Sequence, residues 1–142
     1  MRSLLLFALG AGLAFTALAG PARAQDSHTW TFVAVIEGDS LFIDTHPENF
    51  ACDAGTSECT VTTRRVYATP QEDGDGKTYT AYEARTVYAC GSSAQLSLGG
   101  AQLDAAGQIV GEHQSDQADF EDVPMEYPGA AALYRAACDL TE

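Results

Sequence analysis

Four cysteines are the residues of this chain whose type and spacing most clearly predict chemistry. They are Cys52, Cys59, Cys90 and Cys138 in a chain of 142 residues. An even number of cysteines in a small exported chain indicates disulfides, and four cysteines allow three pairings. We predict Cys52–Cys59, because the two bracket a short loop containing Gly55, and Cys90–Cys138, which would tie a central strand to the C-terminus. Neither pair has the spacing of a structural zinc site.

The other groups that could bind a metal do not form a recognisable pattern. The run Asp73-Gly74-Asp75-Gly76 has the spacing of a calcium loop's first ligands. A third oxygen ligand and a later glutamate in register are missing, so a hairpin turn is the favoured interpretation. The histidines His28, His46 and His113 are scattered near predicted strand ends or loops, and we expect them on the exposed surface. We predict no metal and no cofactor.

Candidate nucleophiles are equally unconvincing. A catalytic serine of the Gly-x-Ser-x-Gly type sits on a strained turn between a strand and a helix. Gly91-Ser92-Ser93 lacks the second glycine and leads into a predicted strand, and Cys90 could react only outside a disulfide. Pairs of carboxylates are expected by chance among 20 acidic residues. We therefore predict that the protein is not an enzyme, with a hydrolase as the third-ranked hypothesis.

The N-terminus has the three parts of a secretory signal. Arg2 precedes an apolar run from Leu4 to Leu18, and the small residues of Ala22-Arg23-Ala24 mark a cleavage site. The run is too short to span a bilayer comfortably, and no later segment is apolar enough to do so. We predict a signal peptide at residues 1–24, a domain at 25–142, a periplasmic or secreted location and no membrane insertion after cleavage.

The charge of the predicted domain restricts its partners. Removing 24 of the 142 residues leaves 118, which suits one domain. Five basic residues then face 20 acidic ones, a net charge of −15. Such a surface repels nucleic acid and anionic lipid headgroups. We interpret the charge either as a means of solubility or as a preference for a protein partner with a basic surface.

Alternating residues predict an antiparallel sheet. The run from Thr29 to Ile36 is partly apolar on both faces, which predicts a central strand. Gly38-Asp39 predicts a tight hairpin into a strand from Leu41 to Asp44. Further strands are predicted at 60–69, 77–89, 93–98, around 103 and at 108–111, with turns at 72–76, 99–100 and 104–107 and an acidic loop at 112–126.

The last segment has helical rather than strand periodicity. It follows Pro128-Gly129 and is rich in alanine, which favours a helix. The residues that share one helical face are Ala131, Leu133, Tyr134, Ala137 and Cys138. The predicted fold class is therefore α+β: a mainly antiparallel β-sheet with a short C-terminal helix tied to the sheet by a disulfide.

The order of these features resembles the surface-adhesin protein E family of bacterial exported proteins. The matching features are the Trp30 strand, the strand Leu41 to Asp44, the strand end Thr86 to Cys90, the turn Asp104 to Gly107, Pro128-Gly129 and Cys138. The resemblance covers nearly all of residues 25–142 and implies a sheet with a C-terminal helix pinned by Cys90–Cys138. This chain departs from the family by lacking a lipid-attachment cysteine and by adding Cys52 and Cys59.

These features lead to two functional hypotheses. Adhesins of the family bind host matrix and plasma proteins, so the resemblance implies an exported, non-catalytic binding module. No binding motif of the family is recognisable, and no binding residue is carried over. The alternative is an inhibitor of a basic secreted enzyme such as a wall hydrolase, which would use the acidic surface for fast encounter. Its best candidate for a loop that enters a cleft is 113–121. The oligomeric state is not indicated.

Overall fold

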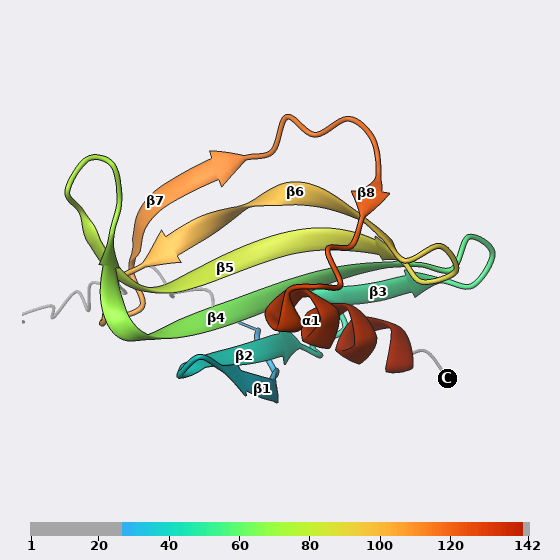
Figure 1. Ribbon diagram of the computed structural model, residues 1–142, viewed down its shortest axis with the longest axis horizontal. Helices are drawn as coiled ribbons and strands as arrows, with labels where there is room; N and C mark the ends of the chain where they lie inside the picture. Colours follow the sequence, from blue (N-terminus) through green and yellow to red (C-terminus); the bar gives the residue numbers. More distant parts are fainter. Residues whose placement is uncertain (1–26, 141–142) are drawn as a thin grey trace, which may run out of the picture.

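The computed structural model describes residues 27–140, so the predicted signal peptide lies outside the described residues. The described chain forms one eight-stranded sheet with a helix packed on one face (Figure 1). The elements are β1 (Trp30–Ile36), β2 (Asp39–Asp44), β3 (Phe50–Asp53), β4 (Glu58–Glu72), β5 (Thr78–Ala89), β6 (Ala94–Leu103), β7 (Ile109–Gln114), β8 (Glu121–Asp122) and α1 (Pro128–Asp139). The predicted α+β class is confirmed.

Three long strands, β4, β5 and β6, form the middle of the sheet. The strand order is β1-β2-β4-β5-β6-β7, and all neighbours are antiparallel. β4 pairs along one edge first with β3 and then with β2, while β6 pairs along its outer edge with β7 and β8. β4 and β6 therefore each pair along one edge with two shorter strands placed end to end.

The predicted hairpin between the first two strands is confirmed. Glu37 and Gly38 form its two-residue loop and have φ angles of 54° and 93°. Positive φ at both central residues is the requirement of a type I′ turn, whose twist matches that of the flanking strands. Gly38 adopts this conformation without the steric cost that a Cβ would add.

The prediction of a central first strand is wrong, because β1 lies at the edge of the sheet. Among the described residues it pairs with β2 alone. Its apolar character on both faces has two separate causes. Val33 packs against the core, whereas Phe32 is 56% exposed and makes an edge-to-face contact with Phe42, with ring centroids 5.8 Å apart. The Phe32–Phe42 pair, on the face of β1 opposite to Val33, therefore gives this edge strand an apolar pattern that is typical of a buried strand.

The predicted break at Gly99-Gly100 is also wrong, because β6 continues through both residues, with a shift in its register to β5 beside Gly99. A Cβ at Gly100 would lie 2.4 Å from Oη of Tyr82, and one at Gly99 would lie 2.5 Å from the carbonyl oxygen of His113. These glycines therefore permit the close approach of a tyrosine from β5 and of the backbone of β7. A glycine in a strand can mark such an approach as well as a turn.

Two further differences concern short or exposed strands. The predicted loop at 112–126 contains the end of β7 and the two residues of β8. β3 was not predicted, because three of its four residues are exposed and its sequence lacks alternation. The turns predicted at 72–76 and 104–107 are confirmed by backbone hydrogen bonds within them.

The core lies between α1 and the sheet. Ala131, Tyr134 and Ala137 are the buried residues of the helix, which confirms three of the five residues of the predicted face, while Leu133 and Cys138 are half-buried. The ring of Tyr134 packs edge-to-face on Tyr88, with centroids 5.8 Å apart, and its hydroxyl donates to the carbonyl oxygen of Cys90 over 2.8 Å. Pro128 at the first helical position suits the start of the helix, where its missing N–H costs nothing.

Both predicted disulfides are present. Cys90–Cys138 ties the end of β5 to the last turn of α1, and Cys52–Cys59 joins directly opposed positions of β3 and β4. Within residues 27–140, no helix is long and apolar enough to cross a membrane.

Candidate interaction surface

A largely apolar pocket of about 450 Å³ lies between the start of α1 and the sheet. Its apolar walls include Ile36, Leu41, Ala84, Tyr127 and Leu133. The helix begins with a proline, a glycine and three alanines, and these small side chains do not fill the space above the sheet. The last turns of the helix are instead held close by Tyr134 and the Cys90–Cys138 bridge. The pocket therefore lies at the end of the helix that carries small side chains, away from the Cys90–Cys138 bridge.

Tyr127 is an exposed large hydrophobic residue of this pocket, at 64%. It is the N-cap residue of α1 and makes no side-chain capping bond. Its backbone is nevertheless fixed, because its N–H donates to the carbonyl oxygen of Pro124 over 2.9 Å and its own carbonyl oxygen accepts from Ala131 over 3.1 Å. A partly apolar ring on a fixed backbone is a common anchor in protein interfaces.

Among the described residues, the one basic residue that lines the pocket, Arg65, is already paired with a carboxylate. Arg65 pairs with Asp39, whose Oδ2 lies 2.7 Å from its Nε. The backbone N–H of Ala68, together with Arg65, holds the pKa of Asp39 below its usual range. Burial raises the pKa of Tyr82, whose hydroxyl lies 3.1 Å from Nε2 of His113. The remaining charged residue of the pocket is Glu37.

An acidic segment, residues 116–126, leads directly to this pocket. Its exposed acidic residues are Asp116, Asp119, Glu121, Asp122 and Glu126. Phe120 and Met125 lie among them and are also exposed. Val123 is buried, and its N–H donates to the carbonyl oxygen of Ser93 over 2.8 Å. The segment is therefore anchored at Val123 while it presents apolar side chains among carboxylates.

A single glutamine fixes the middle of the acidic segment. Oε1 of Gln117 accepts from the N–H of Ser97 over 3.0 Å, and its Nε2 donates to the carbonyl oxygens of Gln95 and Asp119 over 3.2 and 2.8 Å. These bonds occupy the edge of β6 between β7 and β8, where a further strand residue would otherwise pair. The candidate cleft-entering loop 113–121 is thus pinned to the sheet at Gln117.

The predicted cysteines come together in two neighbouring bridges, whereas the aspartates considered as calcium ligands lie in a turn. Cys52, Cys59, Cys90 and Cys138 are all in disulfides, and Asp73 and Asp75 lie in a hairpin turn. The Oδ1 atom of Asp73 accepts from the N–H groups of Asp75 and Lys77 over 2.9 and 2.8 Å, which confirms the hairpin. Within residues 27–140, no group of three or more His, Cys, Asp or Glu side chains is arranged to hold a metal ion.

The expectation of three exposed histidines is confirmed for His113 and wrong for His28 and His46, which are half-buried. His28 pairs through Nδ1 with Asp44 and stacks on Trp30, with ring centroids 5.0 Å apart. Asp44 attracts the histidine because it is fully buried at the end of β2 and must satisfy its charge within the protein.

Asp44 is held by several donors. Its Oδ1 accepts from the backbone N–H groups of Thr29 and His46 over 2.8 and 3.0 Å, and Oδ2 accepts from Nδ2 of Asn49 over 2.8 Å. Burial by itself would raise the pKa of Asp44, but the hydrogen bonds from His28, Thr29 and His46 outweigh it and lower the pKa. The network fastens the chain before β1 to the end of β2 and has the character of a structural joint.

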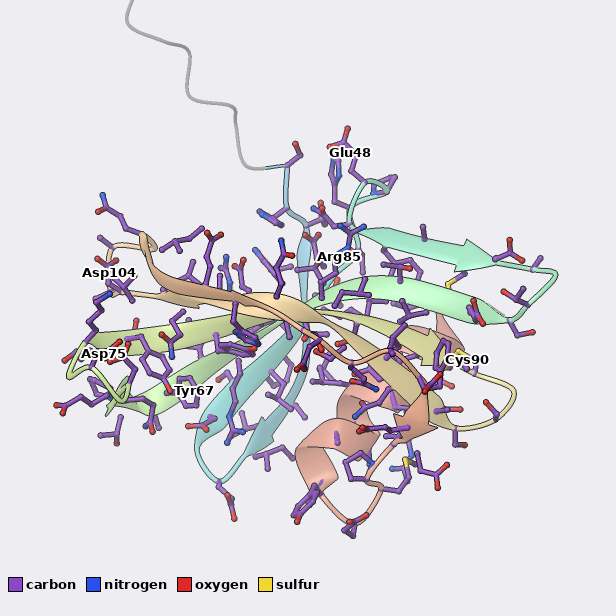
Figure 2. The ribbon with its side chains drawn as sticks, turned by 90° about the horizontal axis from the view of Figure 1, so that it is seen from above. Glu48, Tyr67, Asp75, Arg85, Cys90 and Asp104 are labelled. Carbon is purple, nitrogen blue, oxygen red and sulfur yellow. A yellow bond between two sulfur atoms is a disulfide. The ribbon has the colours of Figure 1, made fainter. Side chains whose placement is uncertain are left out.

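The sheet face away from the helix carries charges of both signs. Figure 2 shows Arg85 on this side of the sheet. A shallow groove of about 520 Å³ passes Arg85, Glu83 and Glu112. Arg64 bonds to Glu83 through Nε over 2.7 Å and lies over the ring of Trp30, 4.1 Å from its centroid. This mixed face is less suited to select a basic partner than the acidic segment.

Comparisons with known protein families, curated proteins and solved structures find no match to this chain. The resemblance to the surface-adhesin protein E family therefore stays a prediction. The function must be argued from the surface itself.

Proposed function

We propose that this protein is an exported, non-catalytic binding module of the surface-adhesin protein E-like type, which binds a protein partner with a basic surface. The observation that carries the proposal is the position of Tyr127. It lies between an exposed acidic segment and an apolar pocket of about 450 Å³. The contact surface is formed by the acidic segment, Tyr127 and the pocket, and we call it the helix-start surface.

The two parts of this surface have different physical roles. Exposed carboxylates attract a basic partner over several ångströms and raise the rate of encounter, with a strong dependence on salt. An apolar side chain of the partner that enters the pocket removes apolar area from water, which slows dissociation. Tyr127 stands where the two parts meet, so it should contribute to the final complex more than to the encounter.

The partner can be sought by capture on the immobilised protein from periplasmic and host extracts, at low and at high salt. We expect a basic protein that is retained at low salt and lost at high salt. Tyr127→Ala should reduce the retention of this protein. Phe32→Ala should not, because Phe32 is similarly exposed but lies outside the helix-start surface, on the face of β1 opposite to Val33. Equal retention by both variants would exclude the helix-start surface. If the captured protein is an enzyme that loses activity in the complex, the binding is inhibitory.

A further inference from the structure

The two disulfides lie against each other at the far end of α1 from the helix-start surface. Sγ of Cys59 is 3.9 Å from Sγ of Cys90, although each belongs to a different bridge. This contact arises because Cys59 is near the start of β4 and Cys90 directly follows the paired end of β5. A thiolate at Cys59 would therefore be in near contact with the sulfur of the second bridge.

The two cysteines of the Cys52–Cys59 bridge differ in their access to solvent. Cys52 is exposed on β3, whereas Cys59 is 1% exposed. A pocket of about 430 Å³ is lined by Cys52, Cys59 and Cys90, and Leu140 forms part of its wall. A volume of this size suits a small molecule. A thiolate that enters from solvent meets the sulfur of Cys52 first, which makes the buried Cys59 the leaving group.

We propose that this end of the molecule is a thiol–disulfide exchange site for a low-molecular-weight thiol. The thiolate attacks Sγ of Cys52, forms a mixed disulfide, and breaks the Cys52–Cys59 bond with the electron pair going to Cys59. The Cys59 thiolate then attacks Sγ of Cys90. A Cys59–Cys90 bond forms, the Cys90–Cys138 bond breaks, and Cys138 takes the electron pair and a proton from water. Two disulfides are present before and after, so no further oxidant or reductant is needed.

The exchange would change what holds the helix. Cys90–Cys138 links α1 to the sheet, whereas Cys59–Cys90 would link β4 to β5, which already pair along most of their length. A thiol that reacts at Cys52 would thus remove the covalent tether of α1. This inference rests on the sulfur geometry alone and is independent of the proposed binding partner.

Two single variants test the second step directly. Cys52→Ser and Cys59→Ser each remove the same small bridge, but the first leaves a thiol at Cys59 and the second leaves one at Cys52. We expect Cys138 to become accessible to an alkylating reagent in the folded Cys52→Ser variant about tenfold faster than in Cys59→Ser, with a Cys59–Cys90 peptide found by mass spectrometry. Circular dichroism checks that both variants are folded.

The wild-type protein gives a second test that does not depend on the folding of a variant. After treatment with one equivalent of glutathione and acid quenching, we expect glutathione on Cys52, a Cys59–Cys90 peptide and a thiol at Cys138. Reduction at Cys52–Cys59 without any Cys59–Cys90 peptide would overturn the proposal. Equal alkylation of Cys138 in the two single variants would overturn it as well.

Discussion

At the scale of single residues, Asp44 shows how a buried charge can be made structural. The carboxylate is fully buried, and its pKa is lowered by donors from His28, Thr29 and His46. A carboxyl group with a lowered pKa in the folded state contributes stability above its unfolded pKa of about 4 and loses it as pH falls through the folded pKa. The joint at the start of β1 should therefore weaken in acid.

Asp44→Asn tests this role. The amide cannot accept at both positions, so we expect a loss of about 2 kcal/mol in the free energy of unfolding at pH 7. The variant should also lose less further stability than the wild type between pH 5 and acid conditions, because the titrating group is gone. Urea unfolding across this range measures both effects, with the exposed Glu48→Gln as control. Parallel pH profiles for Asp44→Asn and the wild type would show that Asp44 does not carry the acid sensitivity.

The sequence predicted some residue pairs and could not predict others. Cys52 and Cys59 are close in sequence and bracket a turn, so their pairing follows from spacing. Asp44 is 16 residues from His28, and its burial depends on the hairpin that returns β2 alongside β1. No local pattern distinguishes it from an exposed acid at a strand end.

At the scale of elements, the edge of β6 depends on Gln117. Its side chain takes the place of a strand peptide and satisfies both Ser97 and Gln95. Gln117→Ala should cost about 1–2 kcal/mol in unfolding free energy, because two backbone groups lose their partners. Hydrogen exchange should speed up at the Ser97 amide, and it should not do so in the exposed neighbour variant Gln114→Ala. Unchanged protection of the Ser97 amide in Gln117→Ala would contradict this role.

The two disulfides should differ in their effect on stability. Their sequence separations are 7 for Cys52–Cys59 and 48 for Cys90–Cys138. In the chain-entropy model the smaller ring contributes about 2.5 kcal/mol and the larger about 4 kcal/mol.

Replacing both cysteines of one pair by serine tests this order without leaving a single thiol. Cys90→Ser/Cys138→Ser should lower the melting temperature more than Cys52→Ser/Cys59→Ser. Thermal unfolding followed by circular dichroism measures the two shifts. Equal shifts would mean that loop closure does not set the order.

Element types were predictable where local signals agree. Alternation, the Gly38-Asp39 turn and the alanine-rich end predicted most strands, the first hairpin and α1. The turn predicted at Gly99-Gly100 was wrong, because glycine permits close packing within a strand as well as turns. The central position predicted for the first strand was wrong, because Phe32 makes its apolar contact with Phe42 on an exposed face of an edge strand. Both errors come from neighbours that only the assembled sheet provides.

At the scale of the whole molecule, the two ends of α1 differ: Cys90–Cys138 ties its last turn to the sheet, and the apolar pocket lies at its first turn. The class and the tether could be predicted, because the cysteines and the terminal helix are visible in the sequence. The pocket could not be predicted, because its walls come from β1, β2, β4, β5 and the start of α1, which only the folded chain brings together. Phe120, Met125 and Tyr127 gave the available signal, as large apolar residues within a stretch otherwise typical of an acidic loop.

The most direct test of the helix-start surface is the pair of rate constants for the captured partner, measured by surface plasmon resonance across a salt series. Exposed charges are screened beyond about 10 Å at 0.1 M salt. We expect Asp122→Asn/Glu126→Gln to slow association and flatten its salt dependence, with dissociation little changed. Tyr127→Ala should speed dissociation by about tenfold while it leaves association nearly unchanged. A salt-insensitive association rate, or wild-type dissociation in Tyr127→Ala, would contradict binding through this surface.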